Sequence, residues 1–163
     1  MFDIHISWEG PFTLEEALKL NGDCDRGLYQ YYGDHPVYGS GVLLYLGEAA
    51  KQTFAQRLSQ HNWQLWSSSP ISIYVGRFVH NLPIEIIEVQ RRIVVAEGIL
   101  LYAHSPGFNT SNLNTTGSRN HEIRVINWGM RKSLFPEVSI NRWESDMTVG
   151  HRAPKEFHPF SFK

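Results

Sequence analysis

The chain has 163 residues, which corresponds to one domain, and 42% apolar against 19% charged residues is typical of an ordered globular protein. Fifteen basic and sixteen acidic residues give a formal net charge of -1. This balance excludes a protein that binds nucleic acid through a strongly positive surface as a whole. Any site for a polyanion therefore has to be a local basic patch.

Cysteine usage and hydropathy exclude further classes. Cys24 is the only cysteine, so neither an intramolecular disulfide nor a zinc centre built from cysteines can form. A secretory signal pattern is absent. The longest apolar stretches, Val42–Leu46 and Ile99–Ala103, have five residues each, far fewer than the roughly 18 that span a bilayer. We expect a soluble, cytoplasmic protein with no membrane partner.

The N-terminal residues predict a strand and a short helix. Residues 2–8 alternate apolar and polar side chains, as a half-buried strand does, and Gly10-Pro11 is expected to end it. Thr13 and Glu16 have the spacing of a capping box, so a short helix should begin directly after Thr13.

The middle of the chain predicts a hairpin followed by two helices and a strand. Residues 27–32 and 42–46 are apolar and aromatic runs joined by a glycine-rich connection, which is typical of a β-hairpin. Helical spacing runs from 49 to 61, strand alternation from 71 to 79, and a long helix from 83 to 102.

A polar loop is expected at 109–120 and a strand at 122–128, whereas the last 30 or so residues follow no regular pattern. The order of elements predicts a mixed α+β domain. Strict βαβ alternation is missing, and no glycine-rich phosphate motif opens a helix.

Glu97 is the residue that most clearly suggests chemistry. On a helix its neighbours three and four positions away are Ile93, Val94, Leu100 and Leu101, all apolar. A carboxylate on an apolar stripe needs a cation, a metal or several hydrogen bonds. A glutamate at the helix rim, or one paired with a buried arginine, would fit the pattern as well.

Two further pairs are candidates. Arg57 and His61 lie four residues apart and share a helix face, where a guanidinium can hold a phosphate oxygen and an imidazole can move protons. Tyr29 and Tyr45 lie in the two hairpin strands, where a phenol can orient a water. Taken alone, the first pair is more simply explained as two solvated side chains and the tyrosines as half-buried sheet residues.

These residues occur in the order of a known family. Gly27-Leu28-Tyr29 and Tyr45-Leu46-Gly47 resemble the paired motif of the GIY-YIG nucleases, with leucine in place of isoleucine twice. The residues that continue the resemblance, in chain order, are Arg57, His61, Glu97, Pro106 and Asn109. The likeness covers about residues 26–112 of a single domain spanning 1–163, with flanks at 1–25 and 113–163.

The resemblance implies a small, mainly antiparallel central sheet flanked by helices, and metal-dependent hydrolysis of phosphodiester bonds in DNA. Glu97 would hold one divalent ion, Mg²⁺ or else Mn²⁺. Arg57 would stabilise phosphate charge, and Tyr29 would position or activate the water. Tyr45 and His61 would contact the phosphate, or His61 would transfer a proton. Asn109 would orient the glutamate or a nearby backbone.

The chain departs from the family pattern after the second motif, where many members carry a basic residue and this chain has Glu48. The basic residues that we expect to track a DNA backbone are Lys51, Arg119, Arg124, Arg131 and Lys132. Ordinary surface arginines and lysines explain that set equally well.

Two alternatives follow. The first is a nucleic-acid-binding module on the same scaffold with weak or no catalysis. The second is an interaction domain that uses the aromatic residues of the tail. A homodimer or an accessory protein is a possible partner besides DNA.

Overall fold

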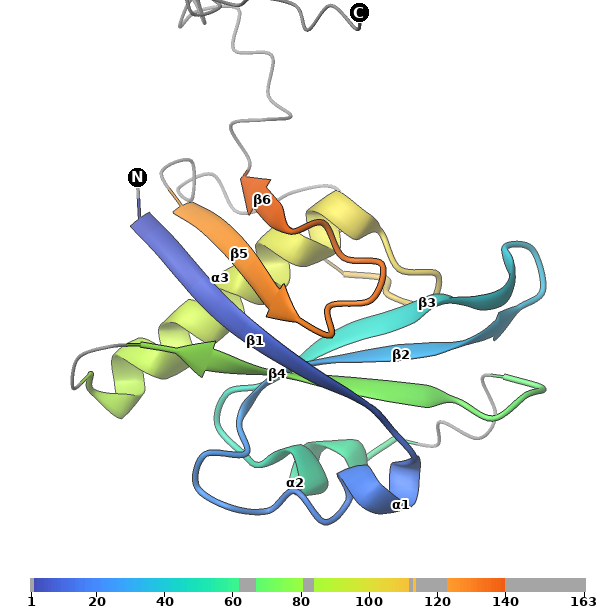
Figure 1. The fold of residues 1–163 in the computed structure, drawn as a ribbon, viewed down its shortest axis with the longest axis horizontal. Helices are drawn as coiled ribbons and strands as arrows, with labels where there is room; N and C mark the ends of the chain where they lie inside the picture. Colours follow the sequence, from blue (N-terminus) through green and yellow to red (C-terminus); the bar gives the residue numbers. More distant parts are fainter. Residues whose placement is uncertain (1, 62–66, 81–83, 112, 114–122, 140–163) are drawn as a thin grey trace, which may run out of the picture.

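The computed structural model describes residues 2–61, 67–80, 84–111, 113 and 123–139. Within this part the chain forms one curled six-stranded sheet and three helices (Figure 1), which confirms the mixed α+β class. The strands are β1 (Phe2–Phe12), β2 (Gly27–His35), β3 (Gly39–Ala49), β4 (Ser72–Val79), β5 (Ile123–Gly129) and β6 (Glu137–Ser139). The helices are α1 (Leu14–Ala17), α2 (Phe54–Leu58) and α3 (Ile86–His104).

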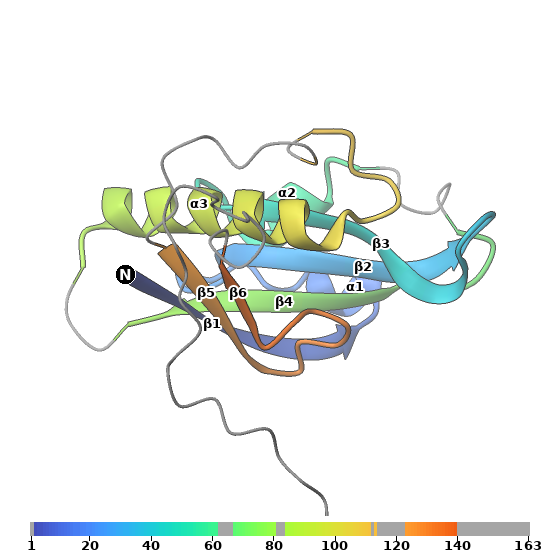
Figure 2. The same cartoon turned by 90° about the horizontal axis from the view of Figure 1, so that it is seen from above.

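The strands lie in the order β3-β2-β4-β1-β5-β6. All neighbours are antiparallel except β1 and β5, which run parallel. The sheet is therefore mainly antiparallel, as expected, and β3 and β6 form its two edges. Figure 2 shows α3 running along one side of the sheet.

Side chains alternate between two apolar clusters because successive strand residues point to opposite faces. On β2, Leu28 and Tyr32 join the cluster that packs against α3. Tyr29 and Tyr31 join the second cluster, together with Phe54 of α2. The short helices and the long helix are thus held by different faces of the same hairpin.

Two elements differ clearly in their bounds from the sequence prediction, and one strand was not predicted. Strand β1 does not end at Gly10-Pro11, since it runs on to Phe12, which pairs with Ile73 across a register shift. Helix α2 covers only Phe54–Leu58, because a capping box starts it after Thr53 and Ser59 ends it as the C-cap, so the helix expected over 49–61 is too long at both ends. Strand β6 is too short to leave a pattern of its own.

The described residues include no helix that is long and apolar enough to cross a membrane. The prediction for most of the loop at 109–120 and for the aromatic tail lies outside the described residues.

The C-terminal end of α3 leads to a prediction about acid stability. Burial lowers the pKa of His104 to about 4, and its Nε2 accepts the backbone N–H of Phe135 at 3.3 Å. The unfolded chain therefore binds a proton more readily than the folded chain between about pH 6.5 and pH 4. We expect the free energy of unfolding to fall over this window, by roughly 1–2 kcal/mol from this group between pH 7 and pH 5.

Urea unfolding of wild type and His104→Gln at both pH values measures this effect. The variant should lose less stability on acidification than wild type does. The matched control is His80→Gln, at an exposed position, which should behave as wild type. An equal loss in all three proteins would contradict the assignment to His104.

Candidate functional site

The two tyrosines of the motif lie on one face of the hairpin. Tyr29 pairs with Gly47 and Tyr31 with Tyr45 across β2 and β3, so all four residues share a side of the sheet. The rings of Tyr29 and Tyr45 are stacked with centroids 6.0 Å apart. Tyr29 is fully buried and Tyr45 half-buried, so the pair forms the floor of a site that opens at Tyr45.

Gly47 leaves room for these rings. A Cβ atom at this position would lie 2.5 Å from Tyr29 Oη and 2.7 Å from Tyr45 Cε1. Such contacts are far inside van der Waals distance, so any side chain here would displace a tyrosine. The motif glycine is needed for the approach of side chains rather than for an unusual backbone conformation.

Helix α2 brings Arg57 to the same face of the hairpin. The helix begins with a capping box between Thr53 and Gln56, and its Phe54 and Leu58 are buried in the cluster that contains Tyr29. The charge of Arg57 acts on both Tyr29 and Tyr45. The arginine therefore lies over the tyrosine floor.

His61 lies beyond the end of α2 and not on the helix, because the helix ends at Leu58 with Ser59 as its C-cap. The histidine nevertheless returns to the site. Its ring is 6.2 Å from that of Tyr45, centroid to centroid, and the charge of Arg57 acts on it.

Glu97 approaches from the other side of the sheet, on α3. It is partly buried, and the backbone N–H of Glu48 on β3 lies close enough to its carboxyl to lower the pKa of that group. Since β3 is an edge strand, this N–H would otherwise lack a partner within the sheet. The positive charge of Arg57 on α2 also acts on Glu97 of α3, so side chains from the two helices interact electrostatically at the β3 edge.

Asn109 binds β3 at Leu46, two residues before Glu48, where the backbone groups again point away from the sheet. Its Oδ1 accepts the N–H of Leu46 at 3.0 Å, and its Nδ2 donates to the Leu46 carbonyl at 2.9 Å. The N–H of Phe108 donates to the carbonyl of Leu44 at 2.8 Å. The loop after α3 thus covers the strand that carries the second half of the motif.

The electrostatics separate the roles of these groups. Burial raises the pKa of Tyr29 far above its usual value, and the charge of Arg57 offsets this only in part. Burial also raises the pKa of Tyr45. Burial, aided by Arg57, lowers the pKa of His61. Near neutral pH the tyrosines are therefore neutral phenols, whereas His61 is a neutral imidazole that can accept a proton.

Glu97 behaves differently because a like charge stands beside it. Burial raises its pKa to about 7, and the carboxylate of Glu48 adds to this rise while Arg57 opposes it. Sequence reasoning noted Glu48 only as a departure from the family pattern. The signal that could have placed it in the site is its position one residue after the motif, next to the edge that Glu97 reaches.

Of the described residues that we expected to contact a DNA backbone, only Lys51 adjoins this site, at an exposed position between β3 and α2. Arg124 lies on β5, four strands from β3, or about 19 Å at the usual strand spacing. Its guanidinium is paired with Asp3 at 2.7 Å and with Glu137 at 3.4 Å. The charge of Arg124 is therefore already paired with carboxylates of the same sheet.

Arg131 and Lys132 do not extend the patch either. Arg131 donates to the carbonyl of Leu134, and Lys132 stands 5.8 Å from the centroid of the Tyr32 ring. Arg119 lies outside the described residues. The structure does not bring Arg124, Arg131 and Lys132 to the candidate site.

No group of three or more histidine, cysteine or acidic side chains that could hold a metal occurs in the part of the chain that the structure describes. Among the described residues of the candidate site, the carboxylates of Glu97 and Glu48 are the acidic groups that could ligate a metal.

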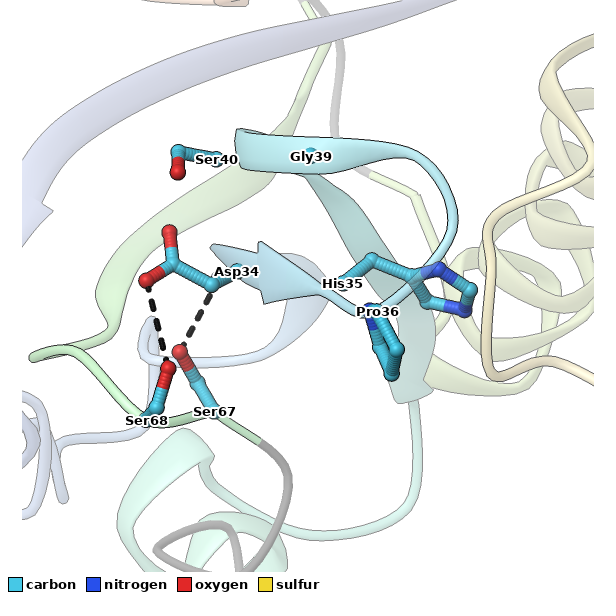
Figure 3. A pocket seen from close by; sticks show the side chains of 7 residues that line it. All are labelled: Asp34, His35, Pro36, Gly39, Ser40, Ser67 and Ser68. Atoms are coloured by element: carbon cyan, nitrogen blue, oxygen red, sulfur yellow. Dashed lines mark hydrogen bonds between the residues drawn. The ribbon is translucent and has the colours of Figure 1, made fainter.

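A separate cavity of about 600 Å³ lies at the far end of the hairpin, roughly 20 Å along β2 from Tyr29. Figure 3 shows that its polar groups engage one another. The N–H of Asp34 donates to Ser67 Oγ at 2.9 Å, and Ser68 Oγ donates to the Asp34 carboxylate at 3.5 Å. This cavity contains none of the predicted site residues.

Comparison with protein-family models, curated proteins and solved structures finds no match for this chain. The family resemblance therefore rests on the ordered motif residues alone.

The close packing at Gly47 gives a stability prediction. Gly47→Ala should destabilise the fold by roughly 1–3 kcal/mol, because the new methyl group overlaps both tyrosines. Gly98→Ala is the matched control, since a Cβ there meets nothing within 4 Å and alanine favours the middle of α3 by about 0.5–1 kcal/mol. Urea unfolding should show opposite signs, and a neutral Gly47→Ala would contradict the geometry.

The paired carboxylates give a titration prediction. In metal-free protein the carboxyl of Glu97 should titrate near pH 7, and Glu48→Gln should lower that pKa by removing a negative charge. Because the folded pKa is raised, the stability from protonated Glu97 is complete below about pH 4.5 and is lost as the pH rises through about 7.

Carboxyl ¹³C chemical shifts, followed against pH, measure this pKa. Glu88→Gln on the same helix is the control and should leave the titration of Glu97 in place. Titration of Glu97 at its ordinary value in wild type would contradict the burial and the neighbouring charge.

Proposed function

We propose that this chain is a metal-dependent DNA endonuclease with a GIY-YIG-like core. The observation that supports this most is the meeting of Arg57 and Glu97, from helices on different faces of the sheet, at the β3 edge beside Tyr29 and Tyr45. Convergence of residues that are 40 positions apart in the chain is what a phosphodiesterase site requires.

The donor set suits a divalent cation of the Mg²⁺ type. Glu97 and Glu48 supply carboxylate oxygens, and Mg²⁺ prefers sparse oxygen sites in which it keeps several waters. Two neighbouring carboxylates in a partly buried place are also stabilised by a cation. The metal, when bound, would stabilise charge on the phosphate and on the leaving oxygen.

Arg57 is suited to hold the phosphate. Its Nε is buried and has no hydrogen-bond partner among the described residues, whereas one terminal nitrogen donates to Gln60 at 3.2 Å. An N–H that is buried without an acceptor carries a desolvation cost. A non-bridging phosphate oxygen would supply that acceptor and receive the charge stabilisation of the guanidinium.

The proton chemistry is best assigned to His61. Its lowered pKa keeps the imidazole neutral near pH 7, so it can accept a proton from the attacking water. The strongly raised pKa of Tyr29 excludes a phenolate there in the free protein. Tyr29 and Tyr45 therefore orient the water or the phosphate as neutral hydrogen-bonding groups.

Cleavage of DNA tests the proposal directly. Purified protein should cut some form of DNA, whether linear, supercoiled, branched or single-stranded, in the presence of Mg²⁺ or Mn²⁺. Arg57→Ala and Glu97→Gln should each reduce the rate by roughly 10²–10³-fold, because each removes charge stabilisation of the transition state.

Arg91→Ala removes an exposed arginine from α3 and is the matched control. Thermal unfolding should show that all variants stay folded. Absence of cleavage in wild type across these DNA forms and both metals would reject the proposal.

A second candidate is a nucleic-acid-binding module with little or no catalysis. The observation that favours it is Glu48, which stands where many members of the family carry a basic residue, so that a basic group expected to assist catalysis is missing. Salt-sensitive DNA binding without cleavage, unchanged in Glu97→Gln, would distinguish this function from a nuclease.

A further inference from the structure

The position of Arg57 depends on contacts outside its own helix. Helix α2 has only five residues, and isolated helices shorter than about 12 residues are marginal even in favourable sequences. The capping box between Thr53 and Gln56 defines where the helix begins, but it does not orient the helix on the sheet. Whatever orients α2 therefore also aims the guanidinium of Arg57.

The segment before β2 supplies this anchor. The backbone carbonyl of Asp25 accepts the N–H of Phe54, the first residue of α2, at 2.8 Å. The carbonyl of Leu20 accepts the N–H of Ala55 at 3.0 Å, and Thr53 Oγ1 donates to Asn21 at 2.7 Å. The N-terminus of α2 is thus bound to residues 20–25.

Arg77 of β4 in turn holds Asp25. One terminal nitrogen donates to Asp25 Oδ1 at 2.7 Å, and the other donates to Glu9 Oε2 at 2.7 Å. The Arg77 and Asp25 side chains are only 23% and 14% exposed, so this pair is less screened by water than a surface ion pair. The other carboxylate oxygen of Asp25 accepts the N–H of Gly22 at 2.9 Å.

Arg77 also contacts the helix directly. Its guanidinium lies 5.8 Å from the centroid of the Phe54 ring, and Phe54 is one helical turn before Arg57. The sheet is therefore connected to the catalytic candidate through Arg77, Asp25 and the first turn of α2.

We propose that Arg77 and Asp25 are positioning residues that orient Arg57 for the phosphate. The inference rests on the proposed nuclease function and deepens it by naming what holds the arginine in place. Neither residue reaches the reacting atoms, since both act through α2. Misplacement of a catalytic group by about 1 Å can cost on the order of 100-fold in rate.

The chain contains a matched control for this pair. Arg124 and Asp3 form a similar, partly exposed ion pair on the same sheet. Its two contacts are 2.9 Å and 2.7 Å long, and both side chains are 31% exposed. That pair joins β5 to β1 and carries no catalytic candidate. A purely stabilising role would make the two pairs equivalent.

The experiment compares Arg77→Gln, Asp25→Asn and Arg124→Gln in steady-state DNA cleavage and in thermal unfolding. The two α2-anchor variants should lose roughly 10- to 100-fold in kcat with little change in KM. Arg124→Gln should keep the wild-type kcat while its melting temperature falls by a similar amount. Arg77→Lys keeps the charge and should recover part of the rate.

A double-mutant cycle identifies the residue through which Arg77 acts. Arg57→Ala combined with Arg77→Gln should cut no more slowly than Arg57→Ala alone, because the group that Arg77 positions is already gone. Multiplied losses would show that Arg77 does not act through Arg57 and would overturn the inference.

The remaining outcomes are also decisive. If wild type cleaves DNA and kcat is unchanged in folded Arg77→Gln and Asp25→Asn, the inference fails and the nuclease proposal stands. If Arg77→Gln, Arg77→Lys and Asp25→Asn all fail to fold, the pair is structural and the inference is overturned. An inactive wild type rejects the function, and the inference with it.

Discussion

The outward backbone groups of strand β3 are the constraint on which the rest of the structure depends. An edge strand presents N–H and C=O groups that its own sheet leaves without partners. In this chain both backbone groups of Leu46 are bound by Asn109, and the N–H of Glu48 lies near the carboxyl of Glu97 and lowers its pKa. The side chains that serve the outward backbone groups of β3 thus bring a carboxylate and an amide beside the motif tyrosines. The same contacts complete the sheet edge and assemble the candidate site.

Burial then decides what each group at this edge can do. Burial among apolar side chains raises the pKa of Tyr29 and keeps its phenol neutral. Burial and the charge of Arg57 lower the pKa of His61 and keep its imidazole neutral. Glu97 is partly buried beside the charge of Glu48, and both effects raise the pKa of its carboxyl to about 7.

Much of the fold could be predicted from local patterns. The alternation in residues 2–8, the hairpin runs and the capping box of Thr13 and Glu16 all correspond to elements of the structure. The errors fall where tertiary contacts override local preference. Strand β1 continues past Gly10-Pro11 because Phe12 pairs with β4, and α2 is short because it begins after its N-cap Thr53 and ends before its C-cap Ser59. Because the helix ends at Leu58, His61 lies beyond it.

The sequence by itself determined the residue types of the candidate site, their order and the faces of the hairpin, because the period of a strand decides which side chains share a side. It also singled out Glu97, a carboxylate on an apolar stripe. Only the tertiary structure decided that Glu97 meets Arg57 across the β3 edge, that Glu48 belongs beside it and that Arg124 is already paired. These outcomes depend on strand order and helix docking, which join residues far apart in the chain and leave no local pattern.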